Sequence, residues 1–289
     1  MPLVDIHGAY DLHIHSSPSL FERSASDLEV ARRARQDGLA GVLLKNHFES
    51  TVGRAALTQE VVPGLKVFGS LVLNNFAGGI NPVAVEHALR LGAREIFMPT
   101  IDAKAHRRTF GHAGGYGYQE SGVRTRREAV GVLDADGVLR PEAKAIVELV
   151  RDFDAILGTA HLEPREIFAL ARFAKETGFT RLLITHPYFD PPRLSVAQQK
   201  ELVELGAVLE LCGGNLYPIP GTARLENYLE TLFEIGPSHL VLSSDAGQPR
   251  KSAPAEVLRV FAQCLMDKGV EQEAIDLMTK KNPARLLGI

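Results

Sequence analysis

The sequence lacks the features that mark several large classes of protein. Its 289 residues include only two cysteines, Cys212 and Cys264, too few for a disulfide framework. No apolar run approaches the roughly 18 residues of a membrane-spanning helix, and residues 1–5 lack the pattern of a signal peptide. The formal net charge of −3 argues against a nucleic-acid-binding protein, which usually carries a basic stripe. These absences predict a cytoplasmic protein that acts on a small molecule; whether it forms a homo-oligomer stays open.

Short apolar segments that end in polar residues alternate with amphipathic segments along the chain. This alternation is typical of buried parallel strands joined by helices. We expect strands at residues 11–16, 41–47, 66–73, 94–100, 155–161, 181–186, 207–212 and 239–245. We expect helices at residues 25–37, 50–60, 81–91, 141–151, 163–177, 195–205, 225–234, 254–266 and 271–278.

Eight strands alternating with helices predict an α/β protein, and a (β/α)8 TIM barrel forming one domain over residues 1–289 is the leading prediction. A doubly wound open sheet is the alternative, because strand order cannot be read from a sequence. No Gly-x-Gly-x-x-Gly fingerprint follows the first strand, which disfavours a dinucleotide-binding protein.

The alternation of strands and helices breaks between residues 101 and 140. No convincing helix is expected there, but glycines cluster with Tyr116 and Tyr118, and Asp-Ala-Asp-Gly at residues 134–137 is a hairpin signal. Long loops in compact domains are usually functional lids or disordered. We therefore interpret this segment as a lid and hairpin inserted after the fourth strand.

The inserted segment is also basic. Residues 104–127 contain six basic residues and one acidic residue, which is a local charge of +5. Since the arginine fork suits carboxylate or phosphate groups, we expect the lid to select a small anionic substrate. A solvated basic loop is the alternative. The candidate substrate-binding residues are Arg107, Arg108, His112 and Arg124, with Arg126 and Arg127 in the same segment.

Histidines and an aspartate mark the ends of the predicted strands. Asp11-Leu12-His13-Ile14-His15 has strand periodicity, which places both histidines on one face, and neutral imidazole is the commonest metal ligand. Barrel enzymes build their active sites from the carboxyl ends of several strands. The side chains expected to converge there on a metal are His13, His15, His47, His161, His186 and Asp245.

These residues resemble the pattern of the metal-dependent amidohydrolase superfamily. The resemblance rests on residues 11–15, His161, Thr185-His186-Pro187, Ser243-Ser244-Asp245 and the closing Asn282-Pro283-Ala284-Arg285. It implies that His13, His15 and Asp245 hold one divalent metal and that His161 and His186 hold or approach a second. The front of the chain through His47 also resembles the polymerase-and-histidinol-phosphatase (PHP) type of metallohydrolase, in which a strand-two histidine belongs to the site.

The chain departs from both patterns. Two-metal amidohydrolases place a bridging lysine or glutamate on strand four, but Phe97-Met98-Pro99-Thr100 offers neither. Lys45, Glu49 or Asp102 could substitute, and one ion is favoured over two. Against the PHP type, no histidine stands two residues after Asp245, and strand three has no glutamate.

The ligand types indicate the chemistry. Nitrogen and oxygen ligands suit Zn, Mn, Fe or Ni, and Cys212 is a lesser candidate ligand. We expect a metal-activated water to attack the substrate, with Asp245 acting first as general base and then as general acid. His186 or Lys45 would stabilise the oxyanion. This chemistry predicts hydrolysis of a C–N or C–O acyl bond in an amide, cyclic amide or lactone. The alternatives are a PHP-type phosphoester hydrolase, a non-oxidative decarboxylase and a non-catalytic metal-binding barrel.

Overall fold

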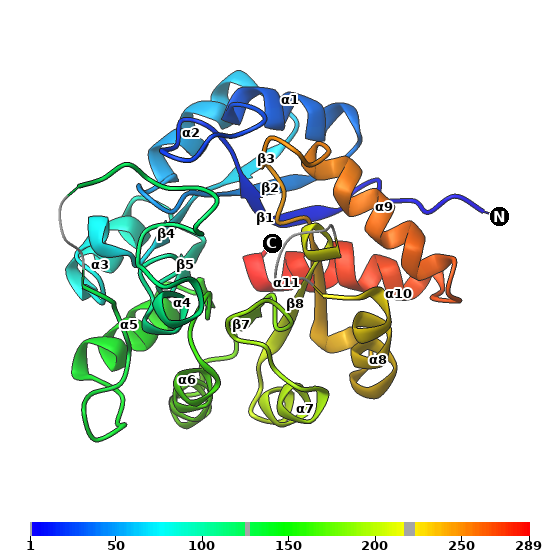
Figure 1. Cartoon of the computed structure of the whole chain (residues 1–289). Coiled ribbons are helices and arrows are strands. Elements are labelled where there is room, and N and C mark those ends of the chain that lie inside the picture. The colour runs from blue at the N-terminus through cyan, green and yellow to red at the C-terminus, as the bar shows by residue number, and fades with distance from the viewer. Residues whose placement is uncertain (1, 125–127, 217–222) are drawn as a thin grey trace.

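Parallel strands form the interior of the protein and helices surround them (Figure 1). This computed structural model describes residues 2–124, 128–216 and 223–289. Its strands are β1 (Tyr10–His15), β2 (Gly41–Lys45), β3 (Lys66–Phe68), β4 (Ser70–Val72), β5 (Glu95–Phe97), β6 (Ile156–Gly158), β7 (Leu182–Thr185), β8 (Val208–Cys212) and β9 (Leu240–Ser243).

The strands lie in chain order around a ring and form two parallel sheets. β1, β2 and β3 form one parallel sheet and β4 to β9 form another, with β3 and β4 separated only by Gly69. A Cβ at Gly69 would clash with Val52 Cα, so glycine permits the close approach of the helix that begins at Val52. Ile14 and Ala246 form a parallel bridge that joins the first strand to the end of the last. The predicted (β/α)8 barrel is confirmed, with β3 and β4 as two parts of the expected strand at 66–73.

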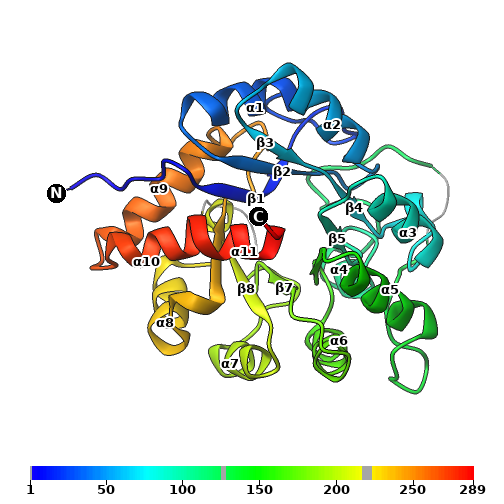
Figure 2. The same cartoon turned by 180° about the vertical axis from the view of Figure 1, so that it is seen from behind.

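The helices follow the strands and cover them on the outside, as the view from behind also shows (Figure 2). They are α1 (Asp27–Gln36), α2 (Val52–Val61), α3 (Pro82–Arg90), α4 (Lys104–Phe110), α5 (Pro141–Asp152), α6 (Pro164–Glu176), α7 (Val196–Glu204), α8 (Leu225–Ile235), α9 (Pro254–Met266), α10 (Gln272–Asp276) and α11 (Asn282–Leu287). Short 3-10 turns occupy Asn75–Ala77, Gly213–Leu216 and Pro237–His239, and a π-helical turn, Leu277–Lys281, joins α10 to α11. Within the described residues, no helix is long and apolar enough to cross a membrane.

The inserted segment contains one element that the sequence pattern did not predict. Helix α4 begins directly after the fourth barrel strand, where no convincing helix was expected. Its buried residues are only Ala105 and His106, so it has no apolar stripe by which periodicity could reveal it. The expected hairpin is confirmed, because Leu133 and Leu139 pair antiparallel and Asp134 N–H donates to the Val138 carbonyl over 2.9 Å.

The barrel interior is apolar except near the carboxyl ends of its strands. Every residue of β2, β7, β8 and β9 is buried, and their valine, leucine and isoleucine side chains belong to one continuous cluster of apolar residues. The strands nevertheless carry buried ionisable side chains, among them Asp11, Lys45, Glu95 and Glu210. Buried charges are costly unless they are paired or bind a ligand, so their place inside the barrel indicates a functional role for this end.

Candidate metal centre

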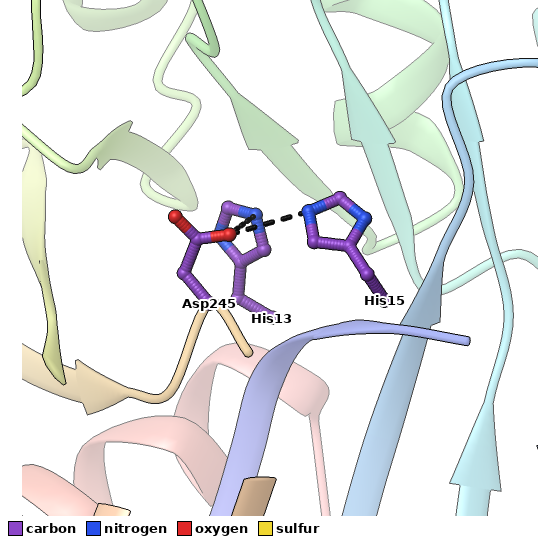
Figure 3. Close-up of side chains that lie close together, drawn as sticks. All are labelled: His13, His15 and Asp245. Carbon is purple, nitrogen blue, oxygen red and sulfur yellow. Dashed lines mark ion pairs between the residues drawn. The ribbon is translucent and has the colours of Figure 1, made fainter. Parts of the chain in front are cut away.

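Two histidines of β1 and the aspartate after β9 meet at one point. His13 Nε2 lies 3.3 Å and His15 Nε2 lies 3.2 Å from the same carboxylate oxygen, Oδ1 of Asp245. Figure 3 shows both imidazoles directed at this oxygen, while the second carboxylate oxygen points away from them. The backbone fixes the arrangement, because Asp245 N–H donates to the His13 carbonyl over 2.9 Å where the barrel closes.

A glutamate that sequence reasoning missed forms a hydrogen bond with one of these histidines. Glu210 on β8 accepts a hydrogen bond from His13 Nδ1 over 3.0 Å, which makes Nε2 of His13 the acceptor nitrogen of the ring. Lys45 on β2 donates to that Nε2 over 2.9 Å. A carboxylate behind a histidine is a common way to fix the tautomer of a metal ligand. The signal in the sequence was a charged residue inside an otherwise apolar strand, Val208–Cys212.

The charges of the group suit a cation. Burial, together with the positive charge of Arg23, lowers the pKa of His15 well below its usual value, so this imidazole is neutral at pH 7. Burial would raise the pKa of Asp245, but the charge on His13, the hydrogen bond from His15 and the charge on Lys251 hold it well below its usual value. A neutral imidazole and an ionised carboxylate are the forms that bind metal.

The donor set therefore fits a divalent metal. One ligand atom each from His13, His15 and Asp245 lies within 4.8 Å of the others. Three nitrogen and oxygen ligands with a further position open are typical of catalytic zinc sites. A second group, His13, Glu210 and Cys212, lies around the other ring nitrogen of His13, Nδ1, which already donates to Glu210 over 3.0 Å.

The other predicted histidines line the same pocket. Ring centroids are 4.9 Å apart for His15 and His47, 5.8 Å for His13 and His186, and 5.2 Å for His161 and His186. Burial lowers the pKa of all three of these additional histidines, that of His186 to about 3. Among the described residues, the compact ligand groups include none of them. The structure thus brings all six predicted ligands to one pocket, but only His13, His15 and Asp245 into one compact ligand group.

Of the candidates to replace the bridging residue, one reaches the centre. Lys45 contacts His13, whereas Glu49 forms an ion pair with Arg54 and Asp102 accepts a hydrogen bond from Asn75 N–H over 2.8 Å. Lys45 is also the buried cation nearest to the Phe97 ring, 4.3 Å from its centroid. Of the three candidates, only the lysine of strand two therefore contacts a predicted metal ligand.

The backbone is strained at three of these strand ends. Asp245 has a φ of 46° and His186 has a φ of 32°, and Ala160, which precedes His161, has a φ of 49°. Non-glycine residues rarely adopt this left-handed region, and such residues cluster at functional sites. The strain accompanies the residues that turn their side chains into the pocket.

The inserted segment closes over the pocket with uncharged side chains. Tyr116, Tyr118 and Gln119 line it, and the remaining cavity has a volume of about 40 Å³. The pocket is lined by His13, His15, Arg23, Lys45, His47, Tyr116, Tyr118, Gln119, His161, His186, Phe189, Asn215, Asp245, Gln248 and Lys251. A cavity of this size holds a few water molecules or one small functional group.

The predicted substrate-binding residues of the insertion lie outside this pocket. Arg108 forms an ion pair with Glu163, and His112 Nε2 lies 2.6 Å from Glu120 Oε1. Arg107 and Arg124 are exposed. Arg126 and Arg127 lie outside the described residues.

Besides the predicted Lys45, two cations that sequence reasoning missed line the pocket. Arg23 stands eight residues after His15, and Lys251 stands six residues after Asp245. Each of them follows, in the chain, a strand that contains or precedes a predicted metal ligand. That spacing was the signal that could have found them.

The fold and this site together define a (β/α)8 barrel with a candidate metal centre at the carboxyl ends of its strands. The chain belongs to a family of unknown function, DUF6282, whose model matches residues 8–210. No curated protein matches the sequence.

Solved structures with the same fold include several proteins described as hydrolases. The organophosphorus hydrolase from Deinococcus radiodurans is 16% identical, with 97% of this chain and 92% of that chain covered and a TM-score of 0.62. The probable dipeptidase PvdM from Pseudomonas aeruginosa is 15% identical, with 97% and 94% covered and a TM-score of 0.64. A metallopeptidase, dipeptidase AC, is 12% identical, with 98% of both chains covered and a TM-score of 0.66. These likenesses confirm the expected (β/α)8 barrel fold.

Proposed function

We propose that this protein is a metal-dependent hydrolase that cleaves a C–N or C–O acyl bond in a small anionic substrate. The observation that carries the proposal is the convergence of His13 Nε2 and His15 Nε2 on Asp245 Oδ1 at the carboxyl ends of the barrel strands. These three residues would hold one divalent ion. Zinc is the first expectation, and Mn, Fe or Ni also suits nitrogen and oxygen ligands.

When bound, such an ion makes water acidic enough to attack at neutral pH and polarises the substrate carbonyl. The protein's own residues then determine where protons and charge go. Asp245 is ionised in the pocket, so its carboxylate can accept the proton of the attacking water and return it to the leaving group. Glu210 keeps His13 in the orientation that this arrangement requires.

The negative charge that develops on the substrate oxygen needs donors on the pocket wall. His186 is neutral because burial lowers its pKa to about 3, so one of its ring nitrogens carries a hydrogen that it can donate. Lys45 is the second donor, buried beside the metal ligands. Donors in a site that excludes water stabilise an oxyanion more strongly than donors in solution.

The names of the structural relatives support an acyl bond as the target. One is described as engineered from a lactonase template and two as dipeptidases, which correspond to C–O and C–N acyl bonds. Organophosphorus hydrolases on the same fold keep a phosphoester as the alternative target.

A substrate panel with the metal-loaded protein tests the proposal. Wild type and Asp245→Asn are assayed on a lactone, an N-acyl amino acid, a dipeptide and an aryl phosphate, with Asp134→Asn in the exposed hairpin as the matched control. We expect turnover of an acyl substrate by wild type and the control, lost on chelation and in Asp245→Asn. Turnover of the phosphate alone would instead establish the phosphoester alternative.

A further inference from the structure

Beside the metal centre, the pocket contains a basic side chain to which the proposed mechanism gives no role. Arg23 lies in the loop between β1 and α1 and lines the pocket with the two tyrosines of the insertion. Its Nε and one terminal nitrogen are buried and have no hydrogen-bond partner among the described residues. The described ion pairs do not include it either. A buried guanidinium without a partner is costly, so this position indicates a missing anionic ligand.

Arg23 keeps its charge in this setting. Burial lowers the pKa of Arg23 to about 10, and the nearby Tyr116, Asp245 and Tyr118 act against that lowering. The side chain is therefore a cation at pH 7. Its Cζ lies 5.6 Å from the centre of the Phe21 ring, so an aromatic face supports one side of the guanidinium.

The loop that carries Arg23 is held from two directions. Ser24 N–H donates to the Gly247 carbonyl over 2.9 Å, which joins this loop to the one after Asp245. Gln119 of the insertion donates from Nε2 to the Glu22 carbonyl over 3.3 Å. A side chain anchored in this way loses little freedom when a ligand binds, which favours binding.

Two further donors stand on the same wall. Lys251 Nζ lies 3.3 Å from the Asp245 carbonyl oxygen, and Asn215 Nδ2 is buried without a partner among the described residues. A Cβ at Gly214 would come within 2.7 Å of Lys251 Nζ, so glycine there leaves room for the ammonium group. The wall thus offers one fork-shaped cation, one ammonium and one amide.

We propose that Arg23, with Lys251 and Asn215, forms a subsite for a carboxylate group of the substrate next to the metal centre. This inference rests on the proposed function and names the group by which its substrate is selected. A planar carboxylate matches the arginine fork and is small enough for a cavity of about 40 Å³. This subsite places anion recognition on the segments after β1, β8 and β9 rather than on the arginines of the insertion.

Calorimetric titration of the full-length protein tests the subsite separately from catalysis. The probes are propionate, the uncharged propionamide of the same shape, and inorganic phosphate, each added to zinc-loaded and to chelator-treated protein. We expect propionate to bind both forms and propionamide to bind neither detectably. Arg23→Gln should weaken propionate binding about tenfold or more in both forms, the effect of one lost charge-assisted hydrogen bond.

Arg250→Gln is the matched control, because Arg250 is exposed in the same loop as Lys251 and does not line the pocket. Arg23→Lys, which keeps the charge but loses the fork, should bind propionate with intermediate strength, and melting curves verify that each variant is folded. Equal binding by wild type and Arg23→Gln, equal binding of propionamide, or tighter binding of phosphate would overturn the carboxylate subsite. The chelator-treated protein carries no metal, so propionate binding to it tests the subsite even if the metal-dependent hydrolysis is not found.

Discussion

The two sides of the pocket use the same residue type for different purposes. On the side of β1 and β9, His13 and His15 face one carboxylate oxygen and Glu210 supports the first of them. On the opposite side, His47 Nδ1 contacts the Thr100 hydroxyl at 2.8 Å, and His161 Nδ1 lies 2.9 Å from His106 Nδ1. Both sides are rich in imidazole, but among the described residues that line the pocket only Asp245 is a carboxylate. This carboxylate therefore decides which histidines form a cation site.

The largest effect that this comparison predicts is on metal content. The double variant His13→Ala/His15→Ala should lose nearly all of the one divalent ion expected per chain, because it removes two of three ligands. The double variant His47→Ala/His161→Ala on the other side should keep it. Elemental analysis of proteins purified without chelator measures both, and equal metal in wild type and the first variant would rule out the site.

Turnover should depend strongly on the shared carboxylate. Asp245→Asn should lower kcat about 10²–10⁴-fold on a confirmed substrate, the usual loss when a general acid–base group is removed. The amide can still contact a metal, so the metal content is measured in the same samples. Activity within a few-fold of wild type would move the proton transfer to another residue, with His186 the next candidate.

Metal affinity should respond to the carboxylate behind His13. Glu210→Gln should weaken zinc binding about 10–100-fold, since residues that orient a metal ligand typically contribute this much. Competition with a chromophoric chelator gives the dissociation constant. Glu95→Gln is the control, because Glu95 is an equally buried carboxyl whose oxygens have no hydrogen-bond partner in the described part of the chain. The same loss in both variants would mean that any buried carboxyl group, and not the contact with His13 in particular, determines the zinc affinity.

The smallest effects should come from the arginines of the insertion. Alanine at Arg107, Arg108 or Arg124 should change KM for a charged substrate less than about twofold, because exposed ion pairs contribute little and none of the three lines the pocket. Kinetics on matched charged and neutral substrates measure this. A tenfold rise in KM for the anion in any one variant would restore the insertion as the anion-selecting element.

Strand ends were predictable because their sequence indicates both the strand and the site residue that follows it. An apolar run followed by a histidine or aspartate gave the barrel strands and also the side chains that meet at the pocket, such as His186 after β7. Helix starts were readable where caps are strong, as at Ser26, whose side chain accepts from Glu29 N–H within a capping box.

The remaining features depend on contacts between distant parts of the chain. Glu210 stands in an apolar strand, and its role appears only when β8 brings it to His13. Arg23 stands in a loop whose position depends on the hydrogen bond between Ser24 and Gly247. Helix α4 buries a histidine against His161 instead of an apolar stripe. Periodicity describes local structure, so it cannot reveal partners that only the folded barrel brings together.

The closure of the barrel gives the metal a place in the order of assembly. Its ligands come from the first strand and from the turn after the last, where Asp245 N–H bonds to the His13 carbonyl. A growing polypeptide therefore cannot complete the cation site until almost all of its strands have emerged and the ring has shut. An ion that binds only the shut ring stabilises it by mass action. Metal binding would thus stabilise the contact between the first strand and the turn after the last strand.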